Sequence, residues 1–275
     1  MFARRRDENW IKMATDDSLY LEGIAPGIPI YKYIPLKYII NMYITKRIVV
    51  NSVTNWEDVY ENYFLKQNLL LNGKPINTDE VCTNTYGMSW TSLKENDAMW
   101  RIYSNYGKGL GDIYDIALRV STTPKNLYDA LSRKEGGRIV HIYKVKYQQQ
   151  GDIDNHLEQL AKAGEYVDRE KEIRESIKTK RAEFTHEQEV RAIIGVDSCH
   201  DDINPSSLYI QFEPNDLFHN FVMDPRVTPE QEHEIKSLLV CLGIDLKKIS
   251  KSQLYNMQKY NIELAPTLSV ETQEN

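Results

Sequence analysis

The chain has 275 residues, of which 41% are hydrophobic and 27% charged, a composition typical of a soluble globular protein. Its net charge of −6 excludes a global basic field that would attract nucleic acid or a membrane, although a local basic groove remains open. The 3 cysteines show no ligand spacing, which excludes a disulfide framework and a structural zinc site. No apolar run approaches the roughly 20 residues of a membrane span, and the N-terminal sequence lacks the apolar core of a secretory signal, so we expect a cytoplasmic protein.

The first half of the chain carries predicted strands and helices after a flexible lead-in over residues 1–28. Alternating apolar residues predict strands, and apolar residues spaced three or four apart predict helices. Strands are predicted at 30–34, 47–51, 86–93, 113–121 and 138–147, and helices are predicted to start at Pro35, Asn55, Asn96 and Thr123. Residues 68–84 are predicted to form a loop. The glycines at 107, 109 and 111 do not match the dinucleotide-binding fingerprint and therefore indicate a turn.

The second half begins with a charged insertion. Residues 153–180 carry a narrow apolar stripe among many charges, which predicts one or two exposed helices inserted into the domain. Strands are predicted at 187–196, 207–213 and 219–223. A capping box of Thr228 and Gln231 predicts a final helix, and residues 266–275 are expected to be disordered. Because strands and helices do not alternate strictly, the order predicts an α+β fold, with one domain over residues 29–265.

The most informative pattern is the pair Glu187 and Glu189. If residues 187–196 form a strand, these two carboxylates and Arg191 share one face, and apolar residues fill the other. Carboxylates this close raise each other's pKa and destabilise the fold unless a cation or a reaction uses them. The alternative is a solvated strand edge in which an arginine balances two acids.

Patterns for other chemistries are absent from the sequence. The six histidines, at positions 141, 156, 186, 200, 219 and 233, show no metal-ligand spacing, so no metal site is expected. There is no phosphate-binding Walker loop, and Ser92 and Ser104 lack the context of a nucleophile elbow.

Several short segments, taken in order, resemble one protein family. They are Ile30–Tyr33, Asn55–Asp58, Trp90–Ser92, Asn96–Tyr103, Ile116–Ser121, Lys180–Arg191, Met223–Arg226 and Lys251–Tyr255. In this order they are similar to a bacterial family long described as a domain of unknown function, whose architecture is similar to ADP-ribosyltransferases. The likeness runs from about residue 30 to about residue 255. Phe184 stands where the family usually has tryptophan and Ile102 where histidine is frequent, so Ile102 receives no catalytic role.

The resemblance implies an ADP-ribosyltransferase-like split β-sheet core with flanking helices, and transfer of ADP-ribose from NAD without a metal. This reaction breaks the bond between nicotinamide and ribose through an oxocarbenium-like state, which a nearby carboxylate stabilises. By the family motif, Glu189 would take this role beside the ribose 2′-hydroxyl. Glu187 would deprotonate or orient the acceptor nucleophile.

The resemblance also suggests which residues would bind NAD. Tyr31 and Tyr33 match the strand position that holds the ribose or nicotinamide, with ordinary core aromatics as the alternative. Ser92 resembles a serine that braces the catalytic glutamate, with a surface strand serine as the alternative. Lys32, Arg101 and Arg119 are candidates for the NAD diphosphate, with surface salt bridges as the alternative.

The implied protein is an intracellular bacterial toxin or anti-phage effector, an NAD-dependent mono-ADP-ribosyltransferase acting on a macromolecule. A protein side chain, RNA and DNA are all open as acceptors, and Lys178, Lys180 and Arg181 with the N-terminal arginines could form a groove for a single strand. A toxic activity implies an antitoxin or another regulatory partner. Two alternatives are a non-catalytic binding module on the same fold and an NAD glycohydrolase that uses water as acceptor.

Overall fold

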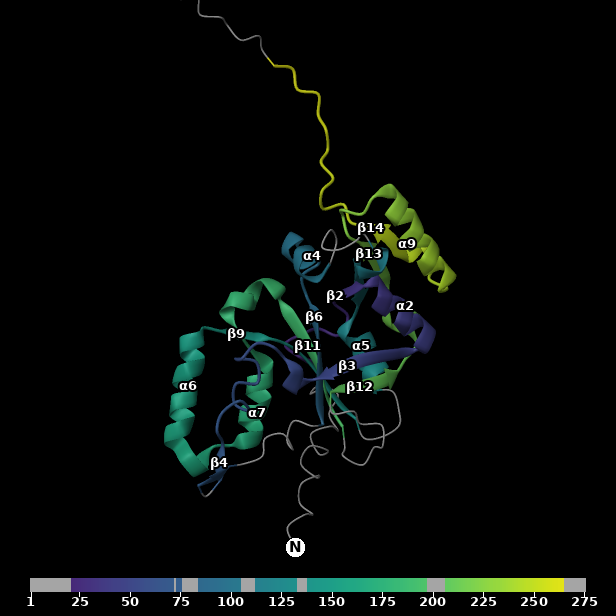
Figure 1. Cartoon of the computed structure of the whole chain (residues 1–275). Helices are drawn as coiled ribbons and strands as arrows, with labels where there is room; N and C mark the ends of the chain where they lie inside the picture. Colours follow the sequence, from purple (N-terminus) through teal and green to yellow (C-terminus); the bar gives the residue numbers. More distant parts are fainter. Residues whose placement is uncertain are drawn as a thin grey trace, which may run out of the picture.

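The computed structural model describes residues 21–71, 73–75, 84–104, 112–132, 138–196 and 206–264, and its strands form a large mixed sheet between helices (Figure 1). Within these residues the large sheet has ten strands: β1 (Leu21–Glu22), β2 (Ile30–Pro35), β3 (Arg47–Ser52), β6 (Thr85–Thr91), β7 (Ala117–Thr122), β8 (Ile139–Lys144), β11 (Glu189–Gly195), β12 (Ser207–Gln211), β13 (Asn220–Met223) and β14 (Ile249–Lys251). The mixture confirms the predicted α+β class, and β1 adds part of the expected lead-in to the sheet through parallel pairing with β8.

The helices and two small two-stranded sheets complete the described fold. The helices are α2 (Leu36–Thr45), α4 (Asp97–Tyr103), α5 (Pro124–Ser132), α6 (Gln150–Ala163), α7 (Arg169–Lys178), α8 (Pro214–Leu217) and α9 (Pro229–Cys241). Short 3-10 turns lie at η3 (Val53–Asn55), η4 (Ile113–Asp115), η5 (Gly164–Tyr166), η6 (Ala182–Glu187) and η7 (Leu246–Lys248). The small sheets pair β4 (Leu70–Leu71) with β5 (Lys74–Pro75), and β9 (Lys146–Gln148) with β10 (Thr179–Arg181).

The large sheet divides at β6. Its main path runs β1-β8-β11-β6-β2-β7-β13-β14, whereas β3 and β12 branch from the other end of β6. Strand β2 pairs with β6 only at Thr91, and β3 pairs with it at Tyr86 and Gly87. The carbonyl of Ser89 lies between these two pairings, and Lys32 Nζ donates to it at 2.6 Å. A lysine side chain therefore satisfies the backbone group that the division leaves unpaired.

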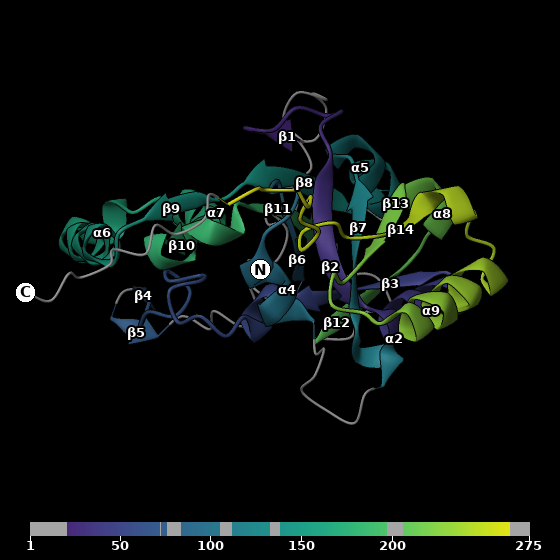
Figure 2. The same ribbon diagram turned by 90° about the horizontal axis from the view of Figure 1, so that it is seen from above.

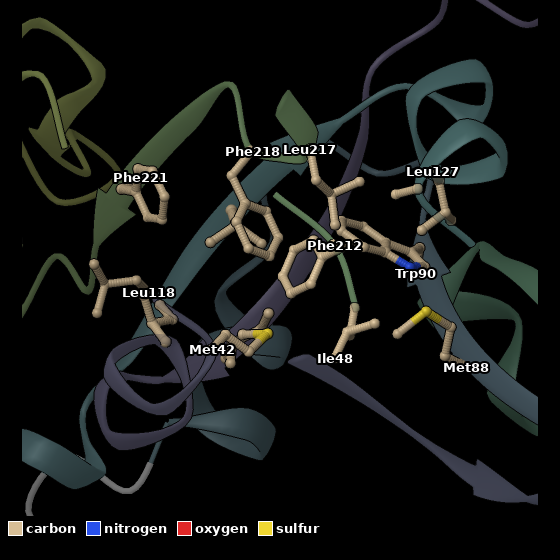
Figure 3. Close-up of a cluster of buried hydrophobic side chains, with 14 of the residues drawn as sticks. Met42, Ile48, Met88, Trp90, Leu118, Leu127, Phe212, Leu217, Phe218 and Phe221 are labelled. Atoms are coloured by element: carbon tan, nitrogen blue, oxygen red, sulfur yellow. The ribbon is translucent and has the colours of Figure 1, made fainter. Parts of the chain in front are cut away.

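One face of the sheet carries the main hydrophobic core (Figure 3). Alternate residues of the sheet strands point to it, among them Met88, Trp90, Leu118 and Phe221. The ring of Phe218 packs against those of Phe212 and Phe221. Helices α2, α5, α8 and α9 cover this face with their apolar stripes. The residues of β11 in the main core are Val190, Ala192 and Ile194, as the alternation predicted, so the acidic residue at position 189 points to the opposite face.

The predicted helical insertion is present and forms a lobe at one end of the sheet. Helices α6 and α7 lie side by side, away from α2 and α9, in both views (Figures 1 and 2). Their apolar stripes pack on Tyr63 and Phe64 of the segment after β3, in a cluster separate from the main core. The lobe therefore joins the insertion to an earlier part of the chain.

Several local predictions are confirmed. Asn96 caps α4 by accepting a hydrogen bond from the Ala98 amide at 2.7 Å, and Thr228 and Gln231 form the capping box of α9. The helix predicted from Asn55 is wrong. Residues 59–66 form turns, because Asn62 adopts a left-handed φ of 57° and its side chain donates to the Val53 carbonyl at 2.7 Å.

Two predicted strands begin later than expected. The strand predicted at 113–121 opens with the turn η4, and the following β7 is buried at every position, so it does not alternate between core and solvent. The strand predicted at 187–196 begins at Glu189, because Glu187 lies in η6 and Gln188 turns the chain with a left-handed φ of 44°. The glycines at 107, 109 and 111, most of the lead-in and the 266–275 tail lie outside the described residues.

Candidate functional site

The candidate site lies on the sheet face opposite the main core. Glu189 on β11 is paired with Thr91 on β6, and Thr91 is paired with Tyr31 on β2. Directly paired residues point to the same face, so these three side chains form a row across the sheet. Two small apolar clusters flank the row, one around Tyr33 and Trp100 and the other around residues 143, 177 and 193. The fold thus sets a polar row between two apolar walls.

The Glu189 carboxylate accepts hydrogen bonds on both oxygens. Oε1 accepts from the Ser89 hydroxyl and from Arg191 Nε, the latter at 2.5 Å. Oε2 accepts from Arg191 Nη2 at 3.1 Å and from Lys180 Nζ at 3.2 Å. The backbone amide of Glu189 donates to the Tyr147 hydroxyl at 2.8 Å, and the residue is 2% exposed. Both the position and the orientation of this carboxylate are fixed.

Lys180 joins the second glutamate to the first. Its ammonium lies 2.6 Å from Glu187 Oε2, 3.2 Å from Glu189 Oε2 and 3.3 Å from Glu61 Oε1. The ring of Phe184 lies 4.6 Å from the same ammonium. One cation is therefore shared by three carboxylates, and it brings Glu187 beside Glu189 although only Glu189 belongs to the strand.

These charges reverse the expected effect of neighbouring carboxylates. Burial alone would raise the pKa of Glu189, but the charge of Arg191 and the bonds from Arg191, Lys180 and Ser89 outweigh it and lower the pKa to about 2. The exception stated for neighbouring acids therefore applies to Glu189, because two cations, Lys180 and Arg191, lie within contact distance of it. Glu189 is ionised at neutral pH despite its burial.

Glu187 is the more accessible member of the pair, with 12% of its side chain exposed. Its backbone carbonyl accepts from the Thr91 hydroxyl at 2.5 Å, which anchors the turn η6 to β6. Its Oε1 lies 3.4 Å from the hydroxyl of Tyr103 on α4. Burial, followed by the charge of Glu187, raises the pKa of Tyr103 to about 12, so this phenol stays protonated at neutral pH.

The three first-strand candidates separate onto two faces. Tyr31 and Tyr33 lie on the site face. There the ring of Tyr33 packs edge-on against Trp100, with 4.7 Å between the ring centroids, and stacks with Tyr103, with 6.3 Å between the centroids. Lys32 shares the core face with Ile30 and reaches the Ser89 carbonyl. Burial lowers the pKa of Lys32 to about 8, although the charge of Glu189 opposes this effect. The side chain of Lys32 therefore fills the division of the sheet and does not lie on the site face with that of Tyr31.

Ser92 and Arg101 lie apart from Glu189. The Ser92 hydroxyl donates to the Gln188 carbonyl at 3.1 Å, and Ser89 is the serine that contacts Glu189. Arg101 is exposed on α4, pairs with Asp97 at 2.7 Å and lies 3.4 Å from the Tyr255 hydroxyl. Ser89 meets Glu189 because the register of β6 against β11 pairs Thr91 with Glu189 and Ser89 with Arg191, on the same face.

Arg119 lies on the site face two strands from Thr91 and lines a pocket of about 230 Å³. The other residues around this pocket are Pro29, Tyr31, Lys94, Ser121, His219, Asn220, Val222 and Ser250. The guanidinium of Arg119 lies 5.1 Å from the Tyr31 ring centroid, and its buried Nε has no hydrogen-bond partner. A cationic pocket therefore adjoins the row that ends at Glu189.

Lys178, Lys180 and Arg181, which were predicted as candidates for a basic groove, are each paired with carboxylates. Lys178 contacts Glu22, Lys180 is buried among three carboxylates, and Arg181 pairs with Asp58 at 2.9 Å. The segment after β3, where a helix was predicted, supplies Asp58 and Glu61, and their carboxylates neutralise this region.

Residues 99–192 match a protein family described as "Protein of unknown function (DUF2971)". No curated protein and no solved structure matches the chain. The matched stretch includes Lys180, Glu187, Glu189 and Arg191, and it stops short of Ser89 on one side. The likeness thus covers the acidic pair and its two cations, and it agrees with the predicted resemblance to a domain of unknown function.

The described residues contain neither a metal-binding cluster nor a membrane-spanning helix. In that part of the chain, no group of three or more His, Cys, Asp or Glu side chains is placed to hold a metal ion. None of the helices described is long and apolar enough to cross a membrane.

Proposed function

We propose that the protein is an NAD-dependent mono-ADP-ribosyltransferase that transfers ADP-ribose to a macromolecule and releases nicotinamide. The observation that carries this proposal is the state of Glu189, which is buried, ionised and oriented by Ser89 and Arg191. A second carboxylate, Glu187, is held next to it by Lys180. An ionised carboxylate with a fixed direction and an adjacent, more exposed carboxylate are what glycosyl transfer requires.

In the proposed reaction the bond between the nicotinamide nitrogen and ribose C1′ breaks, and its electron pair leaves with nicotinamide. Positive charge develops on the ribose ring, where Glu189 stabilises it. Because Glu189 already accepts four hydrogen bonds, the ribose hydroxyl would replace the longest of them, the 3.2 Å contact from Lys180. The preorganised contacts from Ser89 and Arg191 would remain.

Glu187 is proposed to act on the acceptor. Its partial exposure places it nearer to solvent than Glu189, and a nucleophile attacking C1′ must lose a proton to a base. Glu187 would take that proton while the acceptor forms its bond to C1′. The hydroxyl of Tyr103 and the ammonium of Lys180 orient the carboxylate for this step.

The pocket beside Tyr31 suits the remainder of NAD. Arg119 offers a buried donor without a partner, and guanidinium groups bind phosphate oxygens well. Lys94 adds a second basic group to the lining. The division of the sheet at β6 also fits the ADP-ribosyltransferase-like architecture that the sequence resembles. Among the predicted NAD-binding residues, Tyr31 and Arg119 therefore have the strongest support.

The test is to incubate the purified protein with labelled NAD and a cell extract, measuring free nicotinamide and label on protein, RNA and DNA. Release of nicotinamide with label on one macromolecule is expected, and Glu189→Gln should abolish both. If a correctly folded protein releases no nicotinamide and transfers no label, the proposal is wrong. Release without labelling would identify an NAD glycohydrolase instead. Toxicity on expression, relieved by Glu189→Gln, would support a toxin or defence effector controlled by a partner protein.

A non-catalytic binding module is the second candidate, and one observation favours it. Every oxygen of Glu189 is already hydrogen-bonded and the residue is almost completely buried, which also describes a structural ion network. The thermal stability with and without NAD distinguishes the enzyme from a binding module for another ligand, because a ligand that binds only the folded state raises its stability. A binding module for another ligand would show no thermal shift with NAD, and a module that binds NAD would show the shift without cleavage.

A further inference from the structure

Arg191 lies two residues after Glu189 on β11 and points to the same face. Its Nε and Nη2 contact the two oxygens of Glu189, at 2.5 and 3.1 Å. We propose that Arg191 is the positioning residue for Glu189, and that Glu61 and Trp56 hold Arg191 in place for this role. The inference rests on the proposed ADP-ribosyl transfer, since it assigns a role to a residue that would not touch NAD itself.

The guanidinium of Arg191 is fixed on every side. Nη1 donates to the Ile177 carbonyl at 2.7 Å, and Nη2 also donates to Glu61 Oε1. The ring of Trp56 lies 4.2 Å from the guanidinium carbon, and the residue is 1% exposed. Hydrogen bonds in the guanidinium plane and an aromatic ring against it leave little freedom for rotation.

This arrangement explains how Glu189 can be oriented inside a buried site. A planar group with two donors fixes both oxygens of a carboxylate, whereas a lysine ammonium contacts it as a point charge. Lys180 also contacts Glu189, but the three carboxylates around it share its charge. Arg191 is therefore the contact that sets the plane of the Glu189 carboxylate.

The chain contains a matched arginine that lacks this contact. Arg181 also pairs with an acid of the segment after β3, donating to both oxygens of Asp58 at 2.9 and 3.3 Å. It also lies against aromatic rings, 4.9 Å from Tyr60 and 5.5 Å from Phe184. Arg181→Lys therefore disturbs the attachment of the same segment without touching Glu189.

The experiment compares Arg191→Lys with Arg181→Lys in the full chain. Two quantities are measured: kcat and KM for nicotinamide release from NAD, and the pKa of the Glu189 carboxyl by NMR with isotope-labelled glutamate, assigned with Glu189→Gln. For Arg191→Lys we expect kcat to fall about 10- to 100-fold with KM within about threefold of the wild type. The carboxyl pKa should rise, and Arg181→Lys should leave both quantities close to wild type.

Retained kcat with an unchanged pKa in Arg191→Lys would overturn the proposal, and so would an equal loss in Arg181→Lys. If Arg191→Lys does not fold, Glu61→Gln replaces it, since Glu61 accepts a hydrogen bond from Arg191 and helps to hold it in place. The same criteria then apply to Glu61→Gln, with a smaller loss of kcat. If the wild-type protein cleaves no NAD, the proposed reaction fails, and the carboxyl titration alone decides whether Arg191 holds Glu189.

Discussion

The hydroxyl of Ser89 on β6 donates a hydrogen bond to Glu189 on β11, 100 residues further along the chain. Ser92, three residues after Ser89, donates to the backbone carbonyl of Gln188 instead. The register of the two strands causes this difference, since Ser89 is paired with Arg191 and lies diagonal to Glu189 on the same face. The two serines lie close together in the chain and carry the same side chain, but only Ser89 contacts the Glu189 carboxylate.

Replacing each serine with alanine tests this difference. Ser89→Ala should lower kcat for nicotinamide release about 10- to 100-fold, because a hydrogen bond to a charged group contributes about 1.5–3 kcal/mol. It should also raise the pKa of the Glu189 carboxyl, since one bond that favours the ionised form is lost. Ser92→Ala should change neither quantity. Equal loss in both variants would show that the hydroxyl of Ser89 has no particular role.

The two glutamates should respond differently to replacement by glutamine. Glu187→Gln should abolish labelling of the macromolecule and leave slow nicotinamide release, because the variant keeps the carboxylate proposed to stabilise the ribose cation. Glu189→Gln should abolish both. Parallel assays of nicotinamide and of transferred label distinguish these outcomes, and retention of labelling by Glu187→Gln would remove its proposed role as the base.

Stability must be measured with these variants. Glu189→Gln leaves Arg191 and Lys180 with fewer buried carboxylates, so we expect the free energy of unfolding to fall by about 3 kcal/mol. Glu187→Gln should cost less, since its side chain is more exposed and Lys180 keeps two other partners. Denaturant unfolding measures the free energy of unfolding of both variants. An unchanged free energy in Glu189→Gln would show that the ion network contributes little to stability.

Sequence periodicity predicted the strand that carries the site but not the turn before it. The alternation of Val190, Ala192 and Ile194 correctly placed Glu189 and Arg191 on the face away from the core. It also placed Glu187 on that strand, whereas Gln188 turns the chain with a φ of 44°. A left-handed residue that is not glycine has no signature in hydrophobic spacing, so the interruption could not be predicted.

The partners of Arg191, and the burial of Lys180 beside Glu189, were missed for a different reason. Glu61 and Trp56 come from a segment predicted as a helix, and Lys180 was assigned to a charged, solvated insertion. Their approach to Arg191 depends on tertiary packing between loop and insertion, which a local pattern does not encode. Ser89 was missed because strand register, and not spacing along one strand, decides which serine meets Glu189.

Gly87 on β6 tests the packing that supports Arg191. A Cβ added at this glycine would lie 2.5 Å from Cζ2 of Trp56 and 2.9 Å from Cδ1 of Ile193, so the indole would have to move from Arg191. Gly87→Ala should destabilise the protein by about 1–3 kcal/mol and lower kcat. Gly195→Ala on β11 is the control, because nothing lies within 4 Å of its added Cβ. Equal stability of the two variants would contradict this packing.

Lys32 predicts a pH dependence of stability. Its pKa is about 8 in the folded protein against an ordinary value of 10.5, so between these pH values the unfolded chain binds a proton that the folded protein has lost. The free energy of unfolding contributed by Lys32 therefore rises with pH across this window, by at most about 3 kcal/mol. Lys32→Met should remove the rise, apart from a constant loss of the bond to the Ser89 carbonyl. Lys37→Met is the control, since the hydrogen bond that Lys37 donates to Asp115 raises the pKa of Lys37 and leaves it charged throughout the window. The measurement is denaturant unfolding at several pH values. If the free energy of unfolding depends on pH in the same way in the wild type and in Lys32→Met, burial in the divided sheet does not shift the pKa of this lysine.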